Sequence, residues 1–340
     1  MIYYLVTREY SATINLYLEG KGNQLSGQIT PLYYEDLIKR RSLPAGTYIF
    51  SDVERLLPEP AQNIAWLWAD LAKSEHQCTL LNHPTRSFRR YELLRCLYER
   101  GINQFNIYRL TECRKPKSFP VFLRGENDHR GNTTGLLQTP EELDQAIQGM
   151  IQRGESREDC VITEFCDTRD DQGIFRKYSA FKIGDSIVPF HILFRKDWMI
   201  KGGNVYDPDC EQEEADYVMK NPHKSQLQEI FALANIDYGR IDYSLLNGVP
   251  QVWEINTNPN IRPCKLDLGW EKIEKALTAI NPGKTPPTQI PLSVRERIAH
   301  RPYDKGIVDR VMDGFRWLPN QSRVSLSRQL RNFKKTLTKN

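Results

Sequence analysis

Residues 239–261 read GRIDYSLLNGVPQVWEINTNPNI and form two short strand-like runs on either side of a turn-like dipeptide. Side chains at positions i and i+2 of a strand lie on one face, so Arg240 and Asp242 share a face of the first run. Glu254 and Asn256 share a face of the second run. Carboxylate and amide oxygens beside a fixed cation are the groups that hold Mg²⁺ against the phosphates of a nucleotide. The hairpin is therefore a candidate metal site.

The loop length of this hairpin determines whether the two carboxylates can share an ion. If Asn247-Gly248 forms a two-residue turn in a regular hairpin, Asp242 opposes Trp253 and Glu254 points to the other face. A loop one residue longer places Asp242 directly opposite Glu254, where the Cβ atoms are about 4.5–5.5 Å apart. We therefore predict a loop of three or five residues with Gly248 in the left-handed conformation, although the Asn-Gly pair favours a two-residue turn.

The pattern R-x-D, a short hairpin and E-I-N-T-N-P resembles the metal-binding end of the ATP-grasp superfamily. Its carboxylate–amine and carboxylate–thiol ligases include D-alanine–D-alanine ligase, glutathione synthetase and the ribosomal-protein glutamate ligases. The resemblance implies that Asp242, Glu254 and Asn256 coordinate Mg²⁺, or Mn²⁺, between the β- and γ-phosphates of ATP. It also implies that Arg240 supports the transferred phosphoryl group. The alternative is an ordinary surface hairpin whose carboxylates are solvated.

The order of predicted elements indicates an α/β fold. A small parallel α/β domain is predicted for residues 1–108, from apolar strands and helices that alternate over 1–7, 46–51, 59–73, 77–81 and 89–100. The resemblance implies that an ATP-grasp domain follows at 109–282, with an α+β lid at about 115–195 and a metal-binding core at about 196–282. Residues 283–340 are predicted to be a Pro-rich linker and a basic amphipathic tail.

The lid is predicted from a strand, a glycine-containing loop, a helix, a further strand and a hairpin. These elements are expected at 119–123, 125–135, 139–151, 161–165, and 175–183 with 186–194. Helices are also expected at 226–234 and 268–280.

Several residues acquire a role only through the resemblance. ATP-grasp proteins place two lysines on the nucleotide, and Arg90 and Arg124 stand at the corresponding positions here. Arginine keeps the positive charge, but it does not replace lysine freely at a tight phosphate site. Gly125 and Gly131 lie in the loop expected to cover the phosphates, where backbone N–H groups can bind anions. Solvated surface arginines and an ordinary glycine loop are the alternatives.

The predicted hinge and the hairpin after it supply four further candidates. Glu164 and Cys166 correspond to the segment that contacts adenine and ribose, with an ordinary buried strand end as the alternative. Lys182 is expected to contact phosphate. Lys201, in the glycine-containing stretch 201–204, is expected to lie on a mobile loop that closes on the acceptor.

Composition limits the classes of protein to which the chain can belong. No apolar run approaches the ~18 residues of a membrane span, and the N-terminal stretch lacks the basic region of a signal peptide. The seven cysteines contain no C-x-x-C pair, so we expect neither a zinc site nor a disulfide framework. For the same reason we expect a reducing, cytoplasmic location. The net charge is +4, and its basic excess lies in residues 301–340, which are expected to dock on the body of the protein, to touch an acidic surface or to be disordered. No nucleic-acid recognition motif accompanies them.

The expected activity is an ATP- and Mg²⁺-dependent ligation of a small-molecule or peptide carboxylate to an amine through an acyl-phosphate. A kinase that phosphorylates a small molecule is one alternative. A nucleotide-binding module without turnover is the other, and the arginines at the two lysine positions favour it. The chemistry needs no protein nucleophile, and the sequence contains no G-x-S-x-G motif.

Overall fold

The N-terminal part of the chain is built on a parallel sheet with the strand order β2-β1-β4-β5. The computed structural model describes residues 1–37, 39–74, 78–112, 115–127, 132–199, 205, 207–261, 269–281, 283 and 288–299. The sheet strands are β1 (Ile2–Val6), β2 (Ile29–Tyr33), β4 (Thr47–Phe50) and β5 (Thr79–Leu81). All five residues of β1 are buried, as expected for a parallel sheet covered on both faces. The predicted α/β class and its small parallel domain are confirmed.

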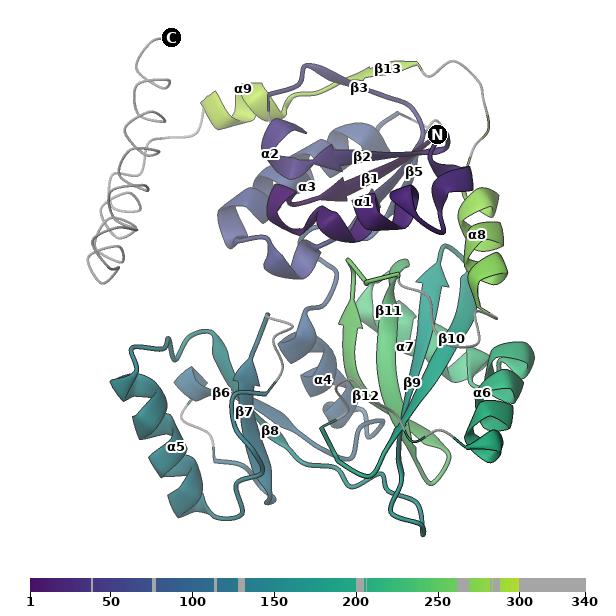
Figure 1. Cartoon of the computed structure of the whole chain (residues 1–340). Helices are drawn as coiled ribbons and strands as arrows, with labels where there is room; N and C mark the ends of the chain where they lie inside the picture. The colour runs from purple at the N-terminus through teal and green to yellow at the C-terminus, as the bar shows by residue number, and fades with distance from the viewer. Residues whose placement is uncertain are drawn as a thin grey trace. The chain divides into compact units, whose positions relative to one another are not determined.

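Short helices connect and cover these strands (Figure 1). The α-helices are α1 (Ala12–Glu19), α2 (Tyr34–Leu37) and α3 (Pro58–Ala72). Single 3-10 turns are η1 (Arg8–Tyr10), η2 (Asn23–Leu25), η3 (Val53–Arg55) and, further along the chain, η4 (Leu110–Glu112). Proline at the first position of α3 begins the helix where no backbone N–H is needed.

A three-stranded antiparallel sheet follows, in the order β6-β8-β7. Its strands are β6 (Ile107–Arg109), β7 (Val121–Gly125) and β8 (Cys160–Glu164), and α5 (Pro140–Gln152) covers one face (Figure 1). Leu143 and Met150 of α5 pack into the small core of this sheet. Because β6 pairs with β8, the proposed domain boundary at residue 108 falls inside a strand of this sheet.

A four-stranded antiparallel sheet, in the order β10-β9-β11-β12, carries the predicted hairpin. Its strands are β9 (Phe175–Ile183), β10 (Ser186–Arg195), β11 (Tyr238–Leu246) and β12 (Val249–Asn256). The hairpin β9–β10 therefore belongs to the sheet of the metal hairpin, because β9 pairs along most of its length with β11. The proposed lid, about 115–195, thus contains strands of two sheets.

The two faces of this sheet have different neighbours. Helices α4 (Arg90–Glu99), α6 (Pro208–Lys220) and α7 (Lys224–Ala234) pack on the face that contains Tyr178, Ala180 and Ile241. The other face shares a core with β1 and with α8 (Trp270–Ala279) through Phe181 and Ile183. The polar end of that second face, with Ser179 in place of an apolar residue, borders the candidate site.

The segment after α8 returns to the N-terminal domain. Strand β13 (Gln289–Pro291) pairs antiparallel with β3 (Ser42–Pro44), and Ile290 and Leu292 are buried. Ser293 donates to the Asp70 carboxylate from its backbone N–H at 2.7 Å and also from its hydroxyl. Residues 288–294, which we call the strap, therefore dock on the N-terminal domain, although they fall within the predicted linker and tail. Helix α9 (Val294–Ala299) follows.

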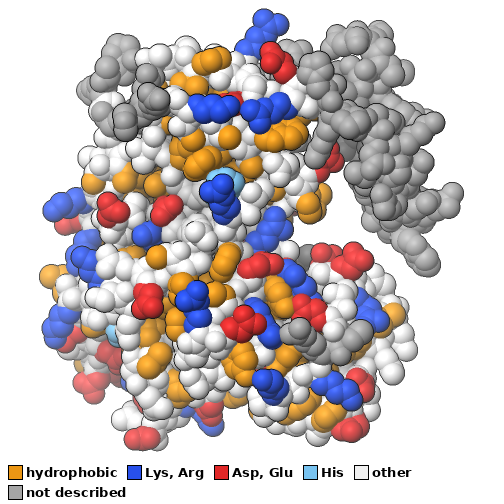
Figure 2. All heavy atoms as spheres, turned by 180° about the vertical axis from the view of Figure 1, so that it is seen from behind, with side chains coloured by type: hydrophobic (Ala, Val, Ile, Leu, Met, Phe, Trp, Pro, Cys, Tyr) orange, Lys and Arg blue, Asp and Glu red, His pale blue; other side chains and the backbone are white. Residues whose placement is uncertain are grey.

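The surface shows no single-sign patch on the face drawn in Figure 2, where acidic and basic side chains are intermixed. Within the described residues, no helix combines the length and the apolar character that crossing a membrane requires. The predicted basic amphipathic segment at 326–337 lies outside the described residues.

Candidate functional site

Strands β11 and β12 bring the predicted metal residues together on one face. Asp242 lies directly opposite Glu254, and Arg240 lies directly opposite Asn256. The opposition of the two carboxylates, predicted from the requirement that they share an ion, is confirmed. Asp242 is 3% exposed and Asn256 is 9% exposed, so these side chains are held in a protein environment and do not form a solvated surface hairpin.

The turn that joins the two strands differs from the prediction. It contains only Asn247 and Gly248, with φ angles of 52° and 77°. The loop of three or five residues is therefore wrong, while the left-handed Gly248 is confirmed. The register shifts next to Asp242, where Trp253 is the extra residue of a β-bulge in β12. The bulge changes the alternation by one residue, so Trp253 and Glu254 both line the same cavity.

Asp242 accepts contacts from three neighbours. Ser179 on β9 donates its hydroxyl to Oδ1 at 2.8 Å, and Arg240 donates Nε to the same oxygen at 3.0 Å. The Lys177 ammonium lies 3.4 Å from Oδ2. Burial alone would raise the pKa of the Asp242 carboxyl. The charges of Arg240 and Lys177 and the Ser179 hydrogen bond outweigh burial and the like charge of Glu254, so the pKa lies below its usual value.

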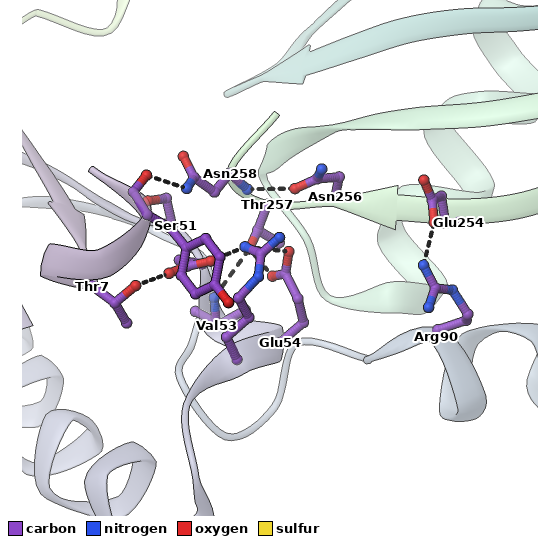
Figure 3. Close-up of polar contacts among 12 residues, drawn as sticks. Thr7, Ser51, Val53, Glu54, Arg90, Glu254, Asn256, Thr257 and Asn258 are labelled. Atoms are coloured by element: carbon purple, nitrogen blue, oxygen red, sulfur yellow. Dashed lines mark hydrogen bonds and ion pairs between the residues drawn. The ribbon is translucent and has the colours of Figure 1, made fainter. Parts of the chain in front are cut away.

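Glu254 is paired with the two arginines that occupy the lysine positions of the resemblance. Arg90 donates Nη2 to Oε2 of Glu254, and Figure 3 shows these two side chains pointing toward each other. Arg124 contacts the same oxygen at 3.3 Å. Arg90 also donates Nη1 to the carbonyl oxygens of Gly125 and Glu126, at 2.9 Å each. Both arginines therefore hold the carboxylate that is predicted to bind the metal.

A cavity of about 220 Å³ adjoins the two carboxylates, with walls from the three-stranded sheet, the four-stranded sheet and the segments that follow them. Its aromatic lining is Phe122, Phe165, Phe175, Trp198 and Trp253, and its polar lining includes Arg124, Asn132, Lys177, Asp242, Ser244 and Glu254. The lining is therefore partly aromatic and partly charged. Trp198 lies against Phe122, with ring centroids 5.1 Å apart, and also contacts Phe165, so these three rings form one aromatic wall.

Cys166 lines this cavity, whereas Glu164 does not lie among its lining residues. Burial and the nearby Asp167 raise the pKa of the Cys166 thiol to about 11, so the thiol stays protonated and offers an apolar surface. The Glu164 carboxylate is buried and accepts hydrogen bonds from the backbone N–H groups of Asn106 and Lys117, at 2.9 and 2.8 Å. This placement does not fit the predicted contact with a ribose.

The two lysines of β9 lie on opposite faces of the strand. Ser179 pairs with Asp242, so Lys177, two residues before Ser179, projects to the side of the cavity. Lys182 has the opposite parity and shares a face with the helix-covered core, which does not fit a phosphate contact in this cavity. Sequence reasoning missed Lys177, and the parity of β9 relative to Asp242 was the signal that could have identified it. The predicted residues Gly131 and Lys201 lie outside the described residues.

The exit of the hairpin contacts the N-terminal domain (Figure 3). Asn256 accepts the backbone N–H of Asn258 at 2.9 Å. Thr257 donates its hydroxyl to the buried Glu54 and accepts the N–H of Val53 at 3.1 Å. Glu54 was not predicted, although it follows the carboxyl end of β4, where parallel sheets gather functional side chains.

The donor set agrees with the requirements of Mg²⁺. Among the described residues there is no group of three His, Cys, Asp or Glu side chains that could hold a metal. Asp242, Glu254 and Asn256 instead provide two carboxylates and an amide on one face. Mg²⁺ usually keeps several waters and takes one or two carboxylates plus substrate phosphates, so this smaller set fits it.

No protein-family model matches the chain, and no curated protein sequence matches it. Among solved structures, the chain is similar to D-alanine–D-alanine ligase from Bacillus anthracis, with a TM-score of 0.49, 13% identity, and coverage of 82% of this chain and 96% of that chain. It is also similar to the RimK-domain ATP-grasp protein from Sphaerobacter thermophilus, with a TM-score of 0.48, 14% identity, and coverage of 83% of this chain and 99% of that chain. For L-amino acid ligase from Bacillus licheniformis, the TM-score is 0.46 and the identity is 11%, with coverage of 81% of this chain and 73% of that chain.

Proposed function

We propose that this chain is an ATP-grasp enzyme that joins a carboxylate to an amine with ATP and Mg²⁺. The observation that supports this most directly is the opposition of Asp242 and Glu254 beside a cavity lined by both aromatic and basic side chains. A solvated hairpin has no reason to hold a buried Asp242 and a partly buried Glu254 among four cations, because burying charge is costly unless it is paired and used. We further propose small-molecule or peptide substrates and a cytoplasmic location.

The cavity suggests how a nucleotide would lie. Phe122, Phe165 and Trp198 form surfaces on which a planar base can stack. Arg124 and Lys177 line the cavity next to the carboxylates, where they can contact phosphate oxygens. The base therefore lies toward the aromatic wall and the triphosphate points toward the hairpin.

The carboxylates and the amide of the hairpin would hold the divalent cation. When bound there, Mg²⁺ supplies neutralisation of phosphate charge and orients the terminal phosphate. Ser179 and Arg240 fix the Asp242 carboxylate from two sides, so its oxygens are positioned before a ligand arrives. The excess of basic over acidic side chains around the hairpin favours a polyanionic ligand.

The reaction would proceed in two steps. A substrate carboxylate oxygen forms a bond to the γ-phosphorus as the bond to the ADP oxygen breaks, which gives an acyl-phosphate and ADP. The amine then forms a bond to the acyl carbon, loses a proton, and releases phosphate. Arg240 and Lys177 are the described cations closest to Asp242 and are placed to stabilise charge on the transferred group. Lys201 remains a predicted contact to the acceptor.

One observation favours a second candidate, a nucleotide-binding module without turnover. Arg90 and Arg124 both contact Oε2 of Glu254, and this pairing opposes the binding of a cation to the same oxygen. A ligase must release this oxygen when the metal and ATP arrive, whereas a module need not.

Product analysis separates these candidates. The parent protein is incubated with ATP, Mg²⁺ and pooled amino acids and small peptides whose carboxylates carry ¹⁸O. A ligase transfers ¹⁸O from the carboxylate to the released phosphate and forms an amide of matching mass. ADP with a stable phosphorylated product indicates a kinase instead. ATP binding in calorimetry without any ADP release indicates the module. Glu254→Gln serves as the inactive control for the ligase and the kinase.

A further inference from the structure

Arg90 occupies an unusual position for a basic side chain. It is the first residue of α4, where the helix dipole disfavours positive charge, and yet it is only 6% exposed. Its partners explain the position. Nη1 is bound by the carbonyl oxygens of Gly125 and Glu126, and Nη2 by the Glu254 carboxylate. Arg90 thus joins the end of β7 to the metal hairpin.

The surrounding ion pairs fix this arrangement. The Glu126 carboxylate accepts Nε and Nη2 of Arg109, at 2.8 and 2.6 Å. Arg109 also donates to Glu92, in the first turn of α4, at 2.7 Å. The backbone carbonyls that hold Arg90 therefore belong to a braced segment. The Arg90 guanidinium is therefore anchored to this segment through the two carbonyls, and its contact with Glu254 is the one a divalent cation would compete for.

One carboxylate oxygen of Glu254 is contacted by two positively charged guanidinium groups. Arg90 and Arg124 both contact Oε2. A divalent cation on that carboxylate would meet two like charges at short range, and their repulsion lowers its affinity. A nucleotide changes this balance because Arg124 lines the cavity and can exchange the carboxylate for a phosphate oxygen. The metal and the nucleotide are then coupled through one carboxylate.

We propose that Arg90 is a positioning residue that competes with the divalent cation for Glu254, so that the metal binds appreciably only together with the nucleotide. This inference rests on the proposed function of the site, and it gives Arg90 a role other than nucleotide contact. The pairing keeps the hairpin charge-balanced while no ligand is bound. It also links occupation of the metal site to the end of β7, whose carbonyl oxygens hold Arg90.

The test measures metal affinity in the full-length protein. Free Mn²⁺ is quantified by electron paramagnetic resonance, with and without a non-hydrolysable ATP analogue. The variants are Arg90→Gln, which removes the charge, Arg90→Lys, which retains it, and Arg95→Gln as the matched control. Arg95 lies on the same helix and pairs with Glu99 and Asn106, away from the hairpin.

We expect Arg90→Gln to bind Mn²⁺ alone about tenfold more tightly than the parent, within the usual range of coupling between sites. Arg90→Lys and Arg95→Gln should match the parent, and adding Glu254→Gln to Arg90→Gln should abolish the gain. An unchanged or weaker Mn²⁺ affinity in Arg90→Gln overturns the proposal. So does a tenfold loss of ATP affinity in EDTA, because it would make Arg90 a nucleotide contact.

Two further outcomes complete the test. If Arg90→Gln does not fold, Arg124→Gln removes the second guanidinium from the same oxygen and should also tighten Mn²⁺ binding, and no change there overturns the proposal. If the parent binds no ATP with or without metal, while Arg90→Gln gains affinity for Mn²⁺ alone, the competition is supported and the proposed function fails.

Discussion

Asp242 and Glu254 lie directly opposite each other, and each carboxylate contacts a different pair of basic side chains. The pairs are Lys177 with Arg240 on Asp242, and Arg90 with Arg124 on Glu254. The hairpin therefore combines a possible cation site with an excess of positive charge, which suits a phosphate chain that arrives with its own metal.

The contacts of Glu254 predict a measurable effect on stability. Glu254→Ala removes the acceptor shared by two largely buried guanidinium groups, and we expect a loss of about 1–3 kcal/mol in the free energy of unfolding. Urea titration followed by circular dichroism measures this loss. Glu99→Ala is the control, because Glu99 forms an exposed pair with Arg95 that contributes about 0–1 kcal/mol. Equal midpoints for the two variants would contradict the structure.

The two lysines of β9, Lys177 and Lys182, allow a matched comparison of two variants in nucleotide binding. Lys177→Met removes a cation that lines the cavity, so we expect ATP affinity in the presence of Mg²⁺ to fall about tenfold, equivalent to about 1.4 kcal/mol. Lys182→Met removes the same charge from the opposite face and should leave the affinity unchanged. Isothermal titration calorimetry compares the two. A larger loss in Lys182→Met would assign the phosphates to the other face.

Because the strap docks on the N-terminal domain, we expect two truncated proteins, one without the strap and one with it, to differ in stability. Ending the chain after residue 285 removes Ile290, Leu292 and Val294, which are buried and stabilise by about 1.5–3 kcal/mol each. We expect a lower melting temperature and faster amide exchange in β3. Ending it after residue 299 keeps the strap and should preserve the parent values in β3. At a temperature where the shorter protein is folded, its ATP affinity should equal that of the parent, and a loss would connect the strap to the site.

The buried His191 side chain is expected to make the free energy of unfolding depend on pH. Burial and the charges of Arg240 and Lys177 lower its pKa to about 3, although Asp242 acts in the opposite direction. The unfolded imidazole takes up a proton as pH falls below about 6.5, while the folded one stays neutral until about pH 3. The unfolded state therefore binds more protons in this window, and stability falls as pH falls.

This contribution is at most about 1.4 kcal/mol per pH unit. The urea midpoint of the parent should decrease from pH 6.5 to pH 5, and His191→Gln should show a shallower decrease. Because every other titrating group is common to both proteins, the difference between the slopes isolates His191. Identical slopes would show that the folded imidazole titrates normally.

The sequence was sufficient for the fold class, and the requirement that Asp242 and Glu254 share an ion predicted their opposition. The local Asn-Gly preference indicated the two-residue turn correctly, whereas the longer loop that we predicted against it was wrong. The bulge at Trp253 restores the opposition of the two carboxylates, and it depends on contacts such as the indole hydrogen bond to Ser244. Such contacts come from chain segments brought together by the fold, and no pattern within β12 indicates them.

The roles of Glu164 and Lys182 stay predictions, and neither residue is among the described residues that line the cavity. Glu164 is surrounded by backbone N–H groups from the segment around Lys117, so its carboxylate serves the connection between β6 and β7. The face of Lys182 is set by the register of β9 against β11. Counting residues back from Asp242 across that register would have selected Lys177.

The pairing of β3 with β13 also bears on the order in which the protein folds during synthesis. Ser42 and Gln289 are hydrogen-bonded across 247 residues of chain. The N-terminal sheet leaves the ribosome first, but the partner of β3 and the hydrogen-bond donor to Asp70 emerge only after both hairpin strands of the candidate site. Closing so long a loop late is slow, and until then β3 is an unpaired edge. The N-terminal domain therefore reaches its final state only after the rest of the body has been made.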